Sequence, residues 1–175
     1  AGATKTRDLA HIRSVFRDAK FDAIVEDVTQ DIGILSIQGP RSRWVLEQLS
    51  DADFGNDAFA FSTHKEISVA GYEGVRAIRI TFMGELGFEL HVPRDACQDV
   101  YRAVMSAGES AGIRDAGYFA TSSLSLEKGY RHWNQDLRCT DTPMQAGLGF
   151  TCKFKTDTPF LGREALEAIR AMPHK

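Results

Sequence analysis

Residues 75–90 constrain the fold of this chain most, because they contain two strand-like runs on either side of a short bend with two glycines. Glycine allows the backbone to turn tightly, so the two runs are expected to pair as a hairpin. Successive side chains of a strand point to opposite faces of the sheet. The alternation in the second run therefore predicts that Glu89 faces away from Phe88 and Leu90.

Glu89 has two possible roles in such a hairpin. A carboxylate fixed on a rigid strand accepts two N–H bonds from a flat, amidine-like edge, such as the 2-amino-4-oxo edge of a pterin, and charge-assisted pairing of this kind is strong. The alternative is a solvated glutamate on the outer face of the hairpin, which ordinary surface alternation also produces. The strand pattern alone leaves both interpretations open.

The remaining apolar periodicity predicts an α+β domain. The pattern gives helices at 11–20, 41–49, 93–108, 118–130 and 163–170, and strands at 22–28, 32–38, 66–70, 75–81 and 147–155. This order does not alternate strand and helix as a doubly wound parallel sheet requires. We therefore expect a mixed, largely antiparallel sheet with helices packed on one face.

Composition and motifs exclude several kinds of function. The 21 basic and 24 acidic residues are interspersed and give a net charge of -3, so no nucleic-acid partner is expected. No apolar run is long enough to cross a membrane, and no membrane partner is expected either. The histidines and the three cysteines lack metal-ligand spacing, so no metal site is predicted. The chain also lacks a glycine-rich dinucleotide fingerprint and a phosphate-binding loop.

Several separated motifs resemble one family. They are Ile37-Gln38-Gly39-Pro40, Gly84-Glu85-Leu86-Gly87-Phe88-Glu89-Leu90, Ser123-Leu124-Ser125-Leu126-Glu127-Lys128-Gly129-Tyr130-Arg131-His132-Trp133 and Ala146-Gly147-Leu148. In this order they are similar to the folate-binding, aminomethyltransferase-like domain of the glycine cleavage T-protein group. The motif at 123–133, together with residues 61–65 and 160–166, is most similar to the sarcosine dehydrogenase branch of that group.

The resemblance implies a place for this chain within a larger enzyme. Residues 1–158 would form part of a folate-binding domain, and 159–175 would begin the linker toward a C-terminal β-rich domain. The parent would be a mitochondrial matrix flavoprotein that oxidises sarcosine, or a related N-methyl amine, at an FAD domain preceding residue 1. This module would then capture the one-carbon unit on tetrahydrofolate and give 5,10-methylenetetrahydrofolate. By itself, the chain is expected to have no dehydrogenase activity.

The resemblance implies two of the four candidate site residues, and residue chemistry suggests the other two. Glu89 matches the pterin-binding glutamate of the family, and Phe82 matches an aromatic position that lines the same pocket. Arg131 and Trp133 lie in a shared motif and offer a cation and an indole to a planar or negatively charged ligand. Their position after a predicted helix also fits a purely structural role, because basic residues complement a helix C-terminus. No catalytic residue is assigned, since the family's catalytic aspartate would lie upstream.

Two other functions stay open at this point. The segment around Gly84 is shared with a non-catalytic regulatory subunit of pyruvate dehydrogenase phosphatase, although the motif at 131–133 speaks against that function. A T-protein-type aminomethyltransferase is the other alternative. It is disfavoured because Thr121 and Ser122 replace an Arg-Asp pair of that family.

Overall fold

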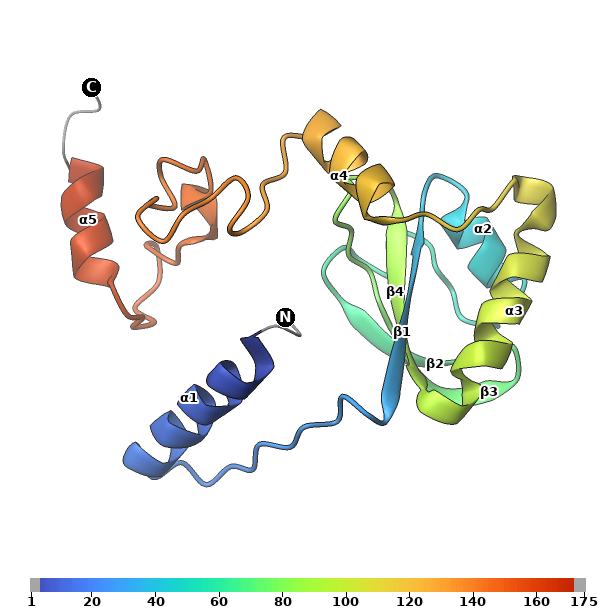
Figure 1. Cartoon of the computed structure of the whole chain (residues 1–175), viewed down its shortest axis with the longest axis horizontal. Helices are drawn as coiled ribbons and strands as arrows, with labels where there is room; N and C mark the ends of the chain where they lie inside the picture. Colours follow the sequence, from blue (N-terminus) through green and yellow to red (C-terminus); the bar gives the residue numbers. More distant parts are fainter. Residues whose placement is uncertain (1–3, 172–175) are drawn as a thin grey trace. The chain divides into compact units, whose positions relative to one another are not determined.

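The computed structural model describes residues 4–171, which fall into two compact units that meet in sequence between Gly117 and Tyr118. Each unit is described by itself (Figure 1). The first unit contains α1 (Lys5–Asp18), β1 (Ile32–Gln38), α2 (Ser42–Glu47), β2 (His64–Val69), β3 (Tyr72–Ile78), β4 (Gly87–Pro93), η2 (Arg94–Ala96), α3 (Cys97–Ala107) and η3 (Glu109–Ala111). The second contains α4 (Tyr118–Glu127), η4 (Gly149–Thr151) and α5 (Arg163–Ala171).

The four strands form one antiparallel sheet in the order β1-β4-β3-β2. Strand β4 is central and pairs with β1 on one side and β3 on the other. The pairing of β3 with β4 confirms the hairpin expected from residues 75–90. Strands β2 and β3 are connected by a two-residue turn at Ala70 and Gly71, where both φ angles are positive as a tight hairpin turn requires.

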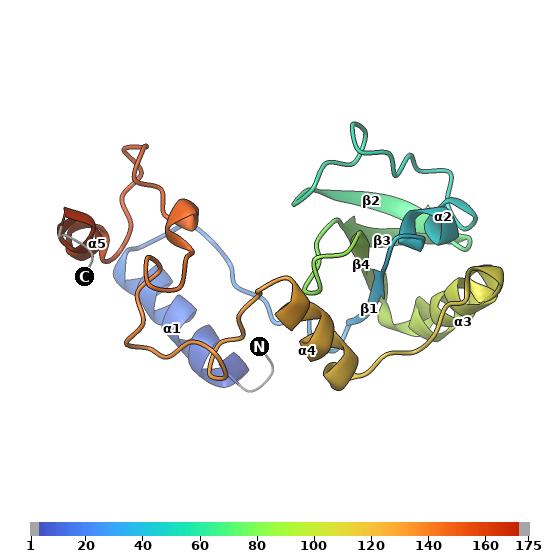
Figure 2. The same ribbon diagram turned by 90° about the horizontal axis from the view of Figure 1, so that it is seen from above.

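Helices α2 and α3 lie on the same side of this sheet (Figure 1), and Figure 2 shows the same arrangement from above. The core between the sheet and these helices is built from fully buried side chains. Its members include Leu46, Phe54, Phe59, Val75, Ala77, Phe88, Leu90, Val92 and Val100. Three of the rings, those of Phe54, Phe59 and Phe88, contact one another at centroid distances of 5.3 to 6.0 Å. The expected α+β class, with a largely antiparallel sheet and helices on one face, is confirmed.

Two of the expected strands do not form. Residues 22–28 have no strand structure, and Ile24 within them is 95% exposed. Residues 147–155 contain a short 3-10 helix, η4, instead of a strand. A short apolar run becomes a strand only when a neighbouring strand satisfies its backbone hydrogen bonds. Neither of these runs has a strand partner within residues 4–171.

The second unit is organised by local polar contacts. Helix α4 ends in a Schellman motif, in which the N–H groups of Tyr130 and Gly129 donate to the carbonyls of Ser125 and Leu126. Gly129 adopts the left-handed conformation that this motif requires, with φ of 67°. Further along, Thr142 and Gln145 exchange side-chain and backbone hydrogen bonds in the pattern of a capping box.

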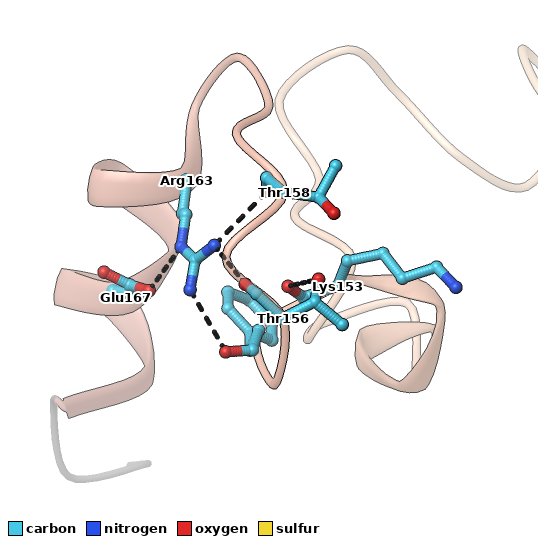
Figure 3. Close-up of polar contacts among 6 residues, drawn as sticks. Lys153, Thr156, Thr158, Arg163 and Glu167 are labelled. Atoms are coloured by element: carbon cyan, nitrogen blue, oxygen red, sulfur yellow. Dashed lines mark hydrogen bonds and ion pairs between the residues drawn. The ribbon is translucent and has the colours of Figure 1, made fainter.

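Arg163, at the start of α5, holds the preceding loop together (Figure 3). Its guanidinium donates to the backbone carbonyls of Phe154, Thr156 and Thr158 and forms an ion pair of 2.9 Å with Glu167. A planar guanidinium has five N–H donors in a fixed fork, so one side chain can bridge several acceptors at once. None of the helices in the described range is long and apolar enough to span a bilayer.

Candidate functional site

Glu89 lies on β4, on the sheet face opposite the helices. Its sequence neighbours Phe88 and Leu90 are fully buried in the core, whereas the Glu89 side chain is 16% exposed. The predicted orientation of Glu89, away from these two residues, is therefore confirmed. The carboxylate is neither in open solvent nor in the core, and its position is fixed by a central strand that is hydrogen-bonded on both sides.

The register of the sheet determines which side chains flank Glu89. Ser36 of β1 and Ile78 of β3 lie directly opposite it on the two neighbouring strands. Side chains directly opposite each other on antiparallel strands have their Cβ atoms about 4.5 to 5.5 Å apart. Glu89 therefore has a hydroxyl on one side and an apolar side chain on the other.

His91 is the next residue of β4 on the same face. Its Nε2 atom lies 3.7 Å from Oε2 of Glu89, and both side chains are largely buried. Nε2 is a buried atom without a hydrogen-bond partner in the described part of the chain. Opposite His91, the neighbouring strands carry Ile34 and Arg76. Within residues 4–171, His91 is the one basic side chain that comes within 4.0 Å of the Glu89 carboxylate.

Gln38, at the end of β1, adds an acceptor to the same face. Its Nε2 donates to Ser36 Oγ at 3.0 Å and to the carbonyl of Ile80 at 3.4 Å, which fixes the orientation of the amide. Its Oε1 is buried and, among residues 4–171, has no hydrogen-bond partner. Gln38 pairs with Gly87, and Oε1 occupies the space that a Cβ at position 87 would need. A side chain at residue 87 would therefore require the amide of Gln38 to move.

Phe82 lies in the loop that connects β3 to β4, and its ring is 60% exposed. This loop is attached to the end of β1 at two points. Ile80 accepts the hydrogen bond from Gln38, and the carbonyl of Leu86 accepts one of 2.7 Å from the N–H of Gly39. The loop that carries Phe82 therefore lies beside Gln38, at the end of the sheet where β4 begins. Glu89 is the third residue of that strand.

Arg131 and Trp133 belong to the second unit, whereas Glu89 and Phe82 belong to the first. Both side chains are exposed, and Trp133 has 61% of its surface accessible. Arg131 donates to the carbonyl of Gly129 at 2.8 Å. The loop that follows is tight, because the Asp136 carboxylate accepts the backbone N–H of His132 at 2.8 Å. The two side chains therefore project from a loop that is held by its own hydrogen bonds.

Sequence reasoning missed His91 and Gln38. The signal for His91 was present, because residues two apart on a strand share a face. Gln38 could be placed near Gly87 only with the register of β1 on β4, which the sequence does not specify. Together, Glu89, Gln38 and Ser36 form a row of oxygen acceptors on two adjacent strands.

This row suits a planar ligand with several N–H donors better than it suits a metal ion. Within residues 4–171, no group of three or more His, Cys, Asp and Glu side chains is arranged to hold a metal. A pocket of about 490 Å³ lies elsewhere in the first unit, between the end of α2 and the turn from β2 to β3. Its lining includes Glu47, Asp51 and Ser68 but none of the site residues expected from the sequence.

Comparison with known proteins identifies the family. The model of the GCVT N-terminal domain matches residues 1–156. The chain belongs to this family. It is 56% identical over 170 residues to "Sarcosine dehydrogenase, mitochondrial" of Mus musculus, an alignment that covers 97% of the chain. It is 35% identical over 95% of its length to dimethylglycine dehydrogenase of Mus musculus, and 41% identical over 82% of its length to the pyruvate dehydrogenase phosphatase regulatory subunit of the same organism.

The family resemblance expected from the motifs is thereby confirmed, including its sarcosine dehydrogenase branch. The chain spans only part of these relatives, namely 18%, 19% and 16% of their respective lengths. All three relatives are named as mitochondrial proteins. The activities in their names belong to chains about five times as long as this one.

Proposed function

We propose that this chain is the folate-binding module of a sarcosine dehydrogenase-like flavoenzyme. In this proposal Glu89 binds the pteridine ring of tetrahydrofolate, and the bound tetrahydrofolate accepts the one-carbon unit from N-methyl oxidation to give 5,10-methylenetetrahydrofolate. The observation that carries the proposal is the Glu89 carboxylate, which is fixed on a central strand, faces away from the core and is 16% exposed.

The residues around Glu89 fit a pteridine edge. The edge presents an amino group and a ring N–H side by side, and a carboxylate accepts both bonds because its two oxygens together offer about four lone-pair sites. Phe82, with its largely exposed ring, is the aromatic side chain that would cover the face of the pteridine.

Arg131 and Trp133 are proposed to complete the folate site. A guanidinium is suited to the carboxylates of a folate tail, and an indole is suited to a planar ring. Both side chains are exposed on a loop that contains the Asp136–His132 hydrogen bond, and they are available for a ligand. Experiment can separate the two roles. Substitution of Arg131 should lower the affinity only for ligands with a charged tail, whereas substitution of Trp133 should lower it for every ligand that contains the ring.

The wider assignment follows from the relatives. We propose that residues 1–158 belong to the folate-binding domain and that 159–175 lead toward a further β-rich domain. FAD would be bound by a separate domain of the parent enzyme, and sarcosine or a related N-methyl amine would be oxidised there. We propose the mitochondrial matrix as the location, and we expect no dehydrogenase activity from this chain alone.

Calorimetric titration with tetrahydrofolate tests the proposal. The wild-type chain should bind, and Glu89→Ala should bind at least tenfold more weakly, because a charge-assisted hydrogen bond contributes about 1.5 to 3 kcal/mol. Glu73→Ala is the matched control, since Glu73 is an exposed glutamate on β3 of the same sheet. Equal affinities for wild type and Glu89→Ala would show that Glu89 does not bind tetrahydrofolate.

A non-catalytic regulatory role is the second candidate, and the 41% identity to the phosphatase regulatory subunit favours it. In that case the same fold would serve as an interaction module. The calorimetric experiment separates the two functions, because absence of heat from both wild type and Glu89→Ala would favour the regulatory role.

A further inference from the structure

The contact between His91 and Glu89 carries an inference that rests on the proposed function and extends it. Both side chains point to the same face of β4, two residues apart, with 3.7 Å between Nε2 and Oε2. A charge-assisted hydrogen bond between nitrogen and a carboxylate oxygen is about 2.7 to 2.9 Å long. The observed distance is about 0.8 Å longer than such a bond, so the two groups are close but not hydrogen-bonded.

The buried state of His91 Nε2 makes this contact unlike an ordinary surface pair. A surface histidine leaves its ring nitrogens to water, whereas Nε2 here is buried and has no hydrogen-bond partner among residues 4–171. An unpaired buried polar atom costs free energy, so it marks a place where a partner is expected. Glu89 is the carboxylate within reach of this nitrogen.

The residues directly opposite His91 on the two neighbouring strands, both within the described range, offer it no acceptor side chain. Ile34, opposite on β1, is apolar, and β1 has no charged residue. Arg76, opposite on β3, is exposed and pairs in register with Glu66 of β2. Among the described residues, the charged side chain opposite His91 on a neighbouring strand is Arg76, which has no acceptor atom, whereas Glu89 on β4 offers a carboxylate oxygen at 3.7 Å.

We propose that His91 is a positioning residue for Glu89. In the ligand-bound chain, His91 Nε2–H donates to Oε2 of Glu89 and fixes the rotation of the carboxylate. The remaining lone pairs of both oxygens then point toward the two N–H groups of the pteridine edge. Hydrogen bonds in ligand sites are often long in the free protein and shorten on binding, which fits the distance of 3.7 Å. Rigid support of this kind raises affinity by reducing the side-chain freedom lost on binding.

The first test needs no ligand. The imidazole ¹⁵N resonances of His91 should move in Glu89→Gln relative to wild type, because the neighbouring carboxylate is replaced by an amide. His64, an exposed histidine on the edge strand β2, is the internal control and should not move. Unchanged His91 resonances in Glu89→Gln would contradict the coupling, whatever the chain binds.

The second test measures tetrahydrofolate affinity in His91 variants. We expect His91→Phe to lower affinity about tenfold and His91→Gln, whose amide nitrogen can take the place of Nε2, to restore most of it. In the Glu89→Gln background, His91→Phe should cause no further loss. His64→Phe serves as the control, and circular dichroism confirms that each variant is folded. If His91→Phe does not fold, the Glu89→Gln comparison and His91→Gln still decide the matter, because His91→Gln should bind within threefold of wild type.

The outcomes separate this inference from the function on which it rests. If Glu89→Gln weakens binding but His91→Phe does not, the positioning role is wrong and the folate site stands. If neither variant changes the affinity, the proposed function fails as well. A loss of affinity in His91→Phe that persists undiminished in the Glu89→Gln background would show that His91 acts independently of Glu89, which also contradicts the proposal.

Discussion

Oε1 of Gln38 occupies the space beside Gly87 in which any larger residue would place its Cβ. The two residues are partners in the β1–β4 register, two positions from the Ser36–Glu89 pair. Turning the amide of Gln38 away would break the hydrogen bonds from its Nε2 to Ser36 Oγ and to the carbonyl of Ile80. The absence of a side chain at residue 87 therefore preserves the acceptor row next to Glu89.

Gly87→Ala should consequently destabilise the chain. Forcing a methyl group into a filled site typically costs about 1 to 3 kcal/mol, and we expect a loss of that size in the free energy of unfolding. Urea denaturation measures it. Gly117→Ala is the matched control, because no atom lies within 4 Å of the Cβ it would add. Combining Gly87→Ala with Gln38→Ala should recover most of the loss, and an undiminished loss in the double variant would show that Gln38 is not the cause.

Arg163→Met should loosen the loop before α5. The guanidinium links three backbone carbonyls of this loop to the first turn of the helix. The Arg163 side chain is 25% exposed, so its hydrogen bonds are only partly screened by water. Their loss should lower the free energy of local opening by about 2 kcal/mol, which corresponds to roughly 30-fold faster proteolysis.

A lysine-specific protease measures this opening, because Lys153 and Lys155 lie in the loop and the Arg163 substitution does not alter their cleavage sites. Arg138→Met removes an exposed arginine from the same unit and serves as the control. Equal cleavage rates at Lys153 and Lys155 in wild type and Arg163→Met would contradict the bridging role of Arg163.

The Tyr101 hydroxyl should lose its proton at a higher pH than that of a free tyrosine. Its hydroxyl donates to the Asp115 carboxylate at 3.0 Å, and this hydrogen bond, with some desolvation, raises the pKa of Tyr101 above 10.0. Because the folded state binds the Tyr101 proton more tightly than the unfolded state, this hydrogen bond adds to the free energy of unfolding below about pH 10. That contribution is lost as pH rises through the folded-state pKa of Tyr101.

Asp115→Asn should therefore bring the pKa of Tyr101 back toward its ordinary value, which the ultraviolet absorbance of tyrosinate records. Asp57→Asn, in an exposed loop residue of the same unit, should leave the titration unchanged. A tyrosinate titration that is identical in wild type and Asp115→Asn would mean that the hydrogen bond does not form in solution.

The local sequence pattern correctly predicted elements that form between neighbouring segments of the chain. The alternation and glycines of residues 75–90 were sufficient for the β3–β4 hairpin, and Gly39-Pro40 correctly separated β1 from α2. Residues 22–28 carry an equally apolar run, yet Ile24 is almost fully exposed and no strand forms. A strand depends on a partner elsewhere in the chain, and the pattern of one segment contains no information about that partner.

The same distinction applies to the site. The orientation of Glu89 followed from a period of two along one strand. Gln38 could not be placed beside it, because the two residues are brought together by the register of β1 on β4. Arg131 and Trp133 were inferred from their residue types and from the shared motif, and neither signal places them relative to Glu89. Register and packing between distant segments, rather than residue types, set the limit of prediction here.

A thermodynamic cycle between Glu89 and the amino group of the pteridine edge measures whether the two groups interact. Dissociation constants are measured for tetrahydrofolate and its 2-desamino analogue with wild type and with Glu89→Gln. If Glu89 accepts the 2-amino group, removing that group should weaken binding to wild type about 10- to 100-fold and change binding to Glu89→Gln much less. An equal loss in both proteins would show that Glu89 does not contact the pteridine edge, and would contradict the account.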